Sequence, residues 1–149
     1  MTRKLKIDRR FTACPIEDGD ELYPNGNFVF NISKMTEYIQ ENPDNIICED
    51  VLVKDYISSF SKLNESHLPT VDVSKPVILA EIAPGRFNVI DGNHRMEKAR
   101  KEGVERISAY KLSPEVHLKF LTTEEGYWAY IEYWNGKLKE IAKLERSRL

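Results

Sequence analysis

The chain has 149 residues, of which 41% are hydrophobic, and its charges leave a formal net charge of −2. This length can bury one core, so we expect a single domain over residues 1–149. The near-neutral charge argues against a protein that coats nucleic acid or acidic membrane by bulk electrostatics, although it allows a local basic surface. Cys14 and Cys48 are too few and too widely spaced for a disulfide framework or a zinc knuckle, and we expect no metal site.

The chain carries no pattern typical of export or membrane insertion. Its first residues, MTRKLKIDRRFTACP, are basic and lack the apolar run of a signal peptide. No later stretch approaches the roughly 20 apolar residues that span a membrane. We therefore expect reduced thiols, a cytoplasmic location and no membrane partner.

The first half of the chain predicts a strand followed by a helix. Turn residues precede a short strand edge at residues 28–30. A helix of about three turns follows, with Asn31 or Ser33 as its N-cap and Pro43 as its stop. Residues 46–70 predict a strand or a helix and then a polar loop.

The second half carries clearer patterns. Residues 75–82 and 86–91 are apolar and β-branched runs, and Gly85 in the turn between them indicates two neighbouring strands. The apolar period then changes toward 3.6, which predicts a helix from about 93 to 102. Residues 104–112 return to a strand, and this strand–helix–strand order suggests a right-handed βαβ unit.

The C-terminal part, residues 113–149, is predicted to be helical, so the fold class is α+β. Ser113 is expected to cap a helix with Pro114 at its first position. A longer helix over residues 123–148 places five apolar side chains along one face. These are Tyr127, Ile131, Trp134, Leu138 and Ile141.

Aromatic side chains on this last helix allow two interpretations. The set comprises Tyr127, Trp128, Tyr130, Tyr133 and Trp134, close in sequence to several Lys and Arg residues, and stacking of bases on them is one option. Burial in the core, or contact with a second copy in a homodimer, is the other. His67 and His117 have no companion at metal-ligand spacing and are interpreted as structural.

The stretch DGNHR, residues 91–95, comes where the predicted strand ends and the next helix begins. The first N–H groups of a helix have no partner within it, and the helix dipole places about half a positive charge there, so this end attracts anions. Gly92 would let a phosphate approach the main chain, while His94 and Arg95 add charge and donors. Cations at this end oppose the dipole, so helix stability alone would favour acids.

Two plainer roles remain open for this turn. It is also compatible with an ordinary strand-to-helix connection, capped by Asn93, in which His94 and Arg95 are solvated. Asp91 would then be a second candidate for the cap. Alternatively, Asp91 holds a metal or accepts a proton in a reaction.

In this context the sequence resembles the ParB/sulfiredoxin superfamily. Sulfiredoxins carry glycine, cysteine, histidine and arginine between a strand and a helix, ParB proteins carry glycine, glutamate, arginine and arginine there, and this chain has Gly92, Asn93, His94 and Arg95. The resemblance extends over roughly residues 22–112, with 46–70 as an insertion. It implies a small mixed sheet with packed helices, to which the C-terminal helical part is an extension.

The resemblance also implies a nucleotide whose phosphates rest on the helix that starts near Asn93, lined by Gly92, His94 and Arg95. Sulfiredoxins bind ATP there, ParB proteins bind CTP, and a related free serine kinase uses ADP with an Asp-Gly-His-Thr-Arg turn. Lys34 and Tyr38 lie about where sulfiredoxins contact the nucleotide, although an ordinary surface position is the simpler interpretation of both.

Two departures from the family's pattern limit which of its activities this chain is expected to have. Asn93 cannot replace the nucleophilic cysteine of sulfiredoxins, because an amide is no substitute for a thiolate. The segment after residue 112 is too short and too aromatic for the helix-turn-helix region of ParB proteins.

Of the activities that the resemblance implies, the one like that of the free serine kinase remains. In it Asp91 positions or deprotonates an acceptor hydroxyl, His94 and Arg95 neutralise phosphate charge, and Mg²⁺ bridges the nucleotide oxygens. The relatives also need an earlier carboxylate, which Glu17, Asp18, Asp20 or Glu21 would supply unless this is a solvated acidic loop.

The sequence therefore predicts a domain that binds ATP, ADP or CTP with Mg²⁺, or another phosphate compound, at the DGNHR turn. Such a site is compatible with a phosphotransferase acting on a small molecule or a protein. The alternative is a ParB-like module that associates with nucleic acid, by DNA binding or as a nuclease, through its basic ends and exposed aromatics.

Overall fold

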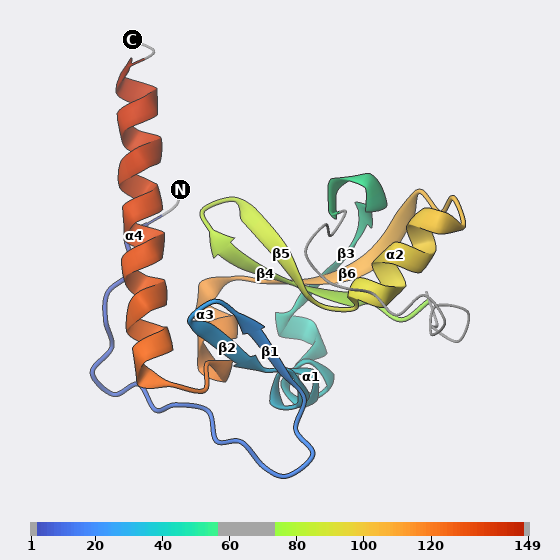
Figure 1. Cartoon of the computed structure of the whole chain (residues 1–149), viewed down its shortest axis with the longest axis horizontal. Coiled ribbons are helices and arrows are strands. Elements are labelled where there is room, and N and C mark those ends of the chain that lie inside the picture. Colours follow the sequence, from blue (N-terminus) through green and yellow to red (C-terminus); the bar gives the residue numbers. More distant parts are fainter. Residues whose placement is uncertain (1–2, 57–73, 148–149) are drawn as a thin grey trace.

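The computed structural model describes residues 3–56 and 74–147 (Figure 1). In these two ranges the chain forms one four-stranded sheet, one two-stranded sheet and four α-helices, which confirms the α+β class. The elements are β1 (Leu22–Asn25), β2 (Phe28–Asn31), α1 (Ile32–Glu41), η1 (Pro43–Asn45), β3 (Ile47–Leu52), η2 (Val53–Tyr56), β4 (Val77–Ala83), β5 (Arg86–Asp91), α2 (Asn93–Lys101), β6 (Arg106–Leu112), α3 (Pro114–His117), η4 (Leu118–Phe120) and α4 (Glu124–Ser147).

The larger sheet has the strand order β3-β6-β4-β5. β4 and β5 form an antiparallel hairpin, turned at Gly85 with φ of 74°, while β4 and β6 are parallel and β3 and β6 are antiparallel. The prediction of a βαβ unit from β5, α2 and β6 is therefore wrong. β4 lies between β5 and β6 in the sheet, so the strands that α2 joins are antiparallel to each other. The parallel neighbours are β4 and β6, and the chain between them contains both β5 and α2.

In the first half the predicted strand and helix are confirmed, but β1 was missed, because Pro24 and Asn25, interpreted as turn residues, pair with β2. α1 begins after Asn31, whose side chain accepts a hydrogen bond from the Lys34 amide at 3.1 Å and so caps the helix. Ser33, the other candidate cap, instead accepts from the Glu21 amide at 2.8 Å. Residues 46–70 begin with strand β3, and the part of this segment from residue 57 on lies outside the described residues, as does His67.

Strand β4 divides two apolar clusters because successive side chains of a strand point to opposite faces. Ile78 and Ala80 pack with α1, β2 and α4 on one face, whereas Val77 and Leu79 pack with α2 on the other. All four side chains are buried. Figure 1 shows α2 on one side of the sheet, and α1 with the β1–β2 hairpin on the other.

The buried residues of helix α4 all lie in its first half, and Leu138 in the second half packs against them only partly buried. Tyr127, Tyr130, Ile131 and Trp134 are buried in the cluster that also contains α1, so the C-terminal part shares its core with the sheet and α1. Tyr130 was not part of the predicted apolar face, and Ile141, which was, is exposed. No helix in the described ranges has the length and apolarity to cross a membrane.

His117 is the buried centre of a polar contact inside this core, as its structural interpretation predicted. Its Nε2 lies 2.8 Å from the Glu81 carbonyl oxygen, and the Tyr130 hydroxyl donates to the same oxygen. Burial lowers the pKa of His117 from 6.5 to about 4, so the ring is neutral at pH 7 and its Nε2–H donates to Glu81.

We predict that this histidine makes the protein less stable at mildly acidic pH. Between pH 6.5 and about 4 the unfolded chain binds a proton that the native ring does not. The free energy of unfolding should therefore fall as the pH is lowered through this window, by up to about 1.4 kcal/mol per pH unit. Urea denaturation followed by circular dichroism at several pH values measures this slope.

The matched variant is His117→Gln, which keeps an N–H donor but does not titrate. It should be less stable at pH 7, and its stability should depend on pH with a slope smaller by about one proton. An unchanged slope in this variant would contradict the assignment of the pH dependence to His117.

Candidate phosphate-binding turn

The DGNHR turn forms where strand β5 ends and helix α2 begins. Asp91 is the last residue of β5, paired with Ile78 of β4, and Gly92 follows with φ of 100°. Only glycine adopts this left-handed conformation without strain, which is why the turn needs glycine here. Gly92 is the N-cap of α2, and no side chain caps the helix. The predictions of Asn93 or Asp91 as the cap are therefore wrong, because the chain already enters the helix at Asn93.

The side chain of Arg95 folds back over this turn. Its Nη2 atom lies 3.1 Å from Asp91 Oδ2, and the two side chains are 17% and 26% exposed. A Cβ atom added to Gly92 would lie 2.7 Å from Arg95 Nη2 and 2.6 Å from Val77 Cγ1. The guanidinium therefore lies against the hydrogen of Gly92, in the space that any other residue would fill.

Arg95 Nε is buried and has no hydrogen-bond partner among the described residues. A buried N–H donor without a partner is costly, and more so on a charged group. The positive end of α2 adds to this cost, because a cation at a helix N-terminus opposes the dipole. Asp91 offsets part of the positive charge, and the buried Nε–H donor stays unsatisfied.

The structure brings Asp91, Gly92 and Arg95 into direct contact, whereas their predicted contact with a phosphate stays a prediction. Asn93 and His94 occupy the first turn of α2 and are partly exposed. Val77 was missed, because its position against Gly92 depends on the pairing of β4 with β5 and no local pattern indicates it.

Lys34 and Tyr38 have other partners. Both are on α1, which packs on the opposite face of the sheet from α2. Lys34 Nζ forms an ion pair with Glu17 at 2.9 Å, and the Tyr38 hydroxyl accepts from Lys119 at 3.3 Å. These contacts do not join the two residues to the turn, and their role in nucleotide binding stays a prediction.

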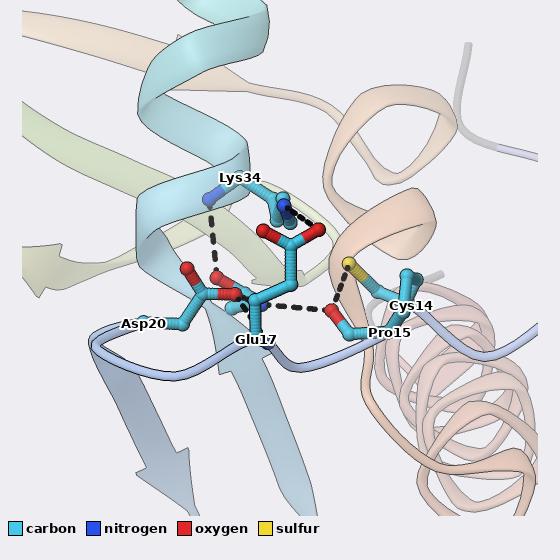
Figure 2. Close-up of polar contacts among 6 residues, drawn as sticks. Cys14, Pro15, Glu17, Asp20 and Lys34 are labelled. Carbon is cyan, nitrogen blue, oxygen red and sulfur yellow. Dashed lines mark hydrogen bonds and ion pairs between the residues drawn. The ribbon is translucent and has the colours of Figure 1, made fainter.

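The acidic loop before β1 is held against the start of α1 (Figure 2). Asp20 accepts a hydrogen bond from Asn31 Nδ2 at 2.8 Å and one from the Glu17 amide at 3.0 Å. These two hydrogen bonds lower the pKa of Asp20. The hydrogen bond between the side chains of Lys34 and Glu17 raises the pKa of Lys34. Glu17 and Asp20 thus support the start of α1, which is a structural role for these two acids.

Two surface cavities lie away from the turn. One, of about 550 Å³, is lined by the N-terminal residues 3–6 together with Glu81, Glu115 and Trp134. The other, of about 270 Å³, is lined by residues that include Ile47, Phe87 and Lys111. In the described part of the chain, His, Cys, Asp and Glu side chains form no group of three or more that would hold a metal ion.

Comparisons of the chain with protein-family models, with curated proteins and with solved structures found no match. The resemblance to the ParB/sulfiredoxin superfamily therefore stays a prediction from the motif.

We predict that Gly92→Ala destabilises the protein by about 2 kcal/mol. The new Cβ would be strained at this φ, and it would meet Val77 and the Arg95 guanidinium. Gly85→Ala is the matched control, because Gly85 also has a positive φ, of 74°, but has open space around it. Gly85→Ala should lower the free energy of unfolding by only about 1 kcal/mol. Equal losses of urea stability in both variants would show that Gly92 is not tightly enclosed.

Proposed function

We propose that the chain binds a phosphate group at the DGNHR turn, and that the ligand is a nucleotide such as ATP, ADP or CTP. The observation that carries this proposal is the Arg95 guanidinium, which lies against Gly92 at the start of α2 with its Nε buried and unpaired. The resemblance of Gly92, Asn93, His94 and Arg95 to the superfamily turn supports the same site.

The turn fits a phosphate because two sources of positive potential meet there. The helix start contributes its dipole and Arg95 a planar fork of donors, and His94 is the next residue in sequence. A phosphate dianion carries more negative charge than Asp91, and its oxygens can also accept two parallel N–H bonds from arginine. Gly92 matters because it lets the guanidinium and the main chain lie close together.

Asp91 competes with the ligand in this arrangement. Its carboxylate already occupies one edge of the guanidinium, at 3.1 Å. A phosphate therefore either binds the remaining donors or displaces Asp91. If the carboxylate is displaced, it becomes available to orient or deprotonate an acceptor hydroxyl, which is the role that phosphotransfer would require.

Mg²⁺, where the nucleotide brings it, would neutralise phosphate charge. Asp91 is the one carboxylate of the turn that would contact it. We propose phosphate binding as the function, with phosphotransfer to a small molecule or a protein as the reaction that these groups would support.

Calorimetric titration of the full chain with ATP, ADP and CTP in the presence of Mg²⁺ tests the proposal. We expect at least one of them to bind, and Arg95→Ala to weaken binding at least about 100-fold, because a charge-assisted bidentate contact is lost. Arg100→Ala is the control, since Arg100 lies on the same helix but forms an ion pair with Glu97 on its exposed surface. The proposal fails if none of the nucleotides binds to the folded protein, or if both arginine variants bind as the wild type does.

Asp91→Asn separates competition from catalysis. Removing the competing charge should strengthen binding of the nucleotide about 3- to 10-fold, as for the loss of a partly exposed ion pair. Weaker binding by this variant would instead show that Asp91 holds the ligand or its Mg²⁺.

A further inference from the structure

Two nitrogens of the Arg95 guanidinium are not available to a ligand in the position that the structure shows. Nη2 lies 3.1 Å from Asp91 Oδ2, and Nε is buried without a partner among the described residues. A ligand that comes from solvent does not reach a buried Nε. A phosphate that accepts two parallel N–H bonds from Nε and Nη2 therefore needs the side chain to move.

The same side chain covers one side of Gly92. A Cβ atom placed on Gly92 would lie 2.7 Å from Arg95 Nη2 and 2.9 Å from Nε, so the guanidinium fills the space that a ligand approaching from this side would need. We call this arrangement, with Nε against Gly92 and Nη2 beside Asp91, the closed position of Arg95. In the closed position the protein's own arginine blocks this side of the turn.

Arg95 is the part of this arrangement that is able to move. Val77 lies on the same side of Gly92, with Cγ1 2.6 Å from the place of the added Cβ, but it has no exposed surface. It belongs to the apolar cluster that includes Met96 and Ala99 of α2. The Arg95 side chain is 17% exposed, and rotation about its side-chain bonds would bring the guanidinium into solvent without disturbing this cluster.

The closed position is only weakly favoured, because its gains and its costs are similar in size. The ion pair with Asp91 is partly exposed, and such pairs contribute little to stability. The unpaired Nε–H and the place of a cation at a helix N-terminus are both unfavourable. In an open position the guanidinium lies in water, where Nε–H is hydrogen-bonded, so we expect a minor population of open molecules.

Arg100, on the same helix, provides an internal comparison. Its Nε donates to both carboxylate oxygens of Glu97, at 3.1 Å each, on the exposed surface. Arg95 and Arg100 thus differ in whether Nε has a partner, although both are on α2. The unpaired Nε is therefore a property of the DGNHR turn and not of arginines on this helix in general.

We propose that a phosphate dianion draws Arg95 out of the closed position and so opens the turn, an inference that rests on the proposed function. In the open position Nε and Nη2 both donate to phosphate oxygens, and Asp91 is released. A ligand shifts such an equilibrium only by the difference between its affinities for the two positions. A carboxylate offers Arg95 no more charge than Asp91 already does, so the closed position selects phosphate groups over carboxylates.

Nuclear magnetic resonance of the arginine Nε–H groups in the isotopically labelled full chain tests the closed position. Without ligand, the Nε–H of Arg95 should exchange with water about 10- to 1000-fold more slowly than that of Arg100, as for an open population of about 0.1–10%. It should also show a nuclear Overhauser contact with the Gly92 Hα atoms. Saturation with ATP, ADP or CTP and Mg²⁺ should remove this contact, whereas acetate should leave it unchanged.

The outcomes separate this inference from the proposed function. Nucleotide binding with an unchanged Gly92 contact overturns the closed position as a block and leaves the proposed function in place. Absence of binding by all three nucleotides overturns both. Fast exchange of the Arg95 Nε–H in the free protein, or loss of the contact in acetate, overturns the inference alone.

Val77→Thr tests whether the closed position competes with the ligand. Its hydroxyl replaces a methyl group beside Gly92 and offers the Arg95 Nε–H an acceptor, so the closed position becomes more stable. We expect nucleotide binding to weaken about 10-fold, the effect of one hydrogen bond to a charged group. Val51→Thr is the matched control, because Val51 is buried in the same cluster but on β3, which β6 separates from β4.

Val51→Thr should lose stability through its buried hydroxyl and still bind nucleotide as the wild type does. Unchanged binding by Val77→Thr, or equal weakening in both threonine variants, contradicts competition between the closed position and the ligand. The magnetic resonance measurement uses the wild-type chain and decides the question if Val77→Thr does not fold.

Discussion

Strand β4 is the element on which the rest of the structure depends, because it is buried on both faces. Val77, Leu79 and Ala80 have no exposed surface, and Ile78 has 3%. Each face of β4 anchors a different apolar cluster, so α1 and α4 are held on one side of the sheet and α2 on the other. The same strand supplies Val77 as the wall against Gly92, and in this way the core determines the geometry of the candidate site.

The candidate site is a balance of charges within one turn. Arg95 lies at the positive end of α2, an unfavourable place for a cation, and only Asp91 compensates it there in the described structure. Helix stability alone would not select this arrangement, because an acid in the first turn would be more favourable. An arginine at the start of α2 lowers the stability of the helix, and anion binding at this turn, which is the role that we propose, would explain its presence.

Local patterns predicted most elements of this fold correctly, whereas the connections between them were harder to predict. The caps and turns at Asn31 and Gly85 depend on neighbours only a few residues away, and they were predicted. The βαβ unit was wrong because the position of β4 between β5 and β6 depends on long-range pairing, which a strand–helix–strand pattern does not contain. Tyr130 was left out of the predicted apolar face because its burial follows from contacts with His117 and Glu81, which lie on other elements.

By itself, the sequence determined that a glycine turn joins a strand to a helix at residues 91–95, because this depends on backbone sterics and apolar periodicity. It also placed an acid and an arginine four residues apart, which is the spacing of an ion pair. Only the tertiary structure decided that Arg95 folds over Gly92 against Val77, and that Lys34 and Tyr38 are on the other face of the sheet. The physical reason is that the face on which a helix packs is set by the order and register of the strands, and these arise from contacts between distant parts of the chain.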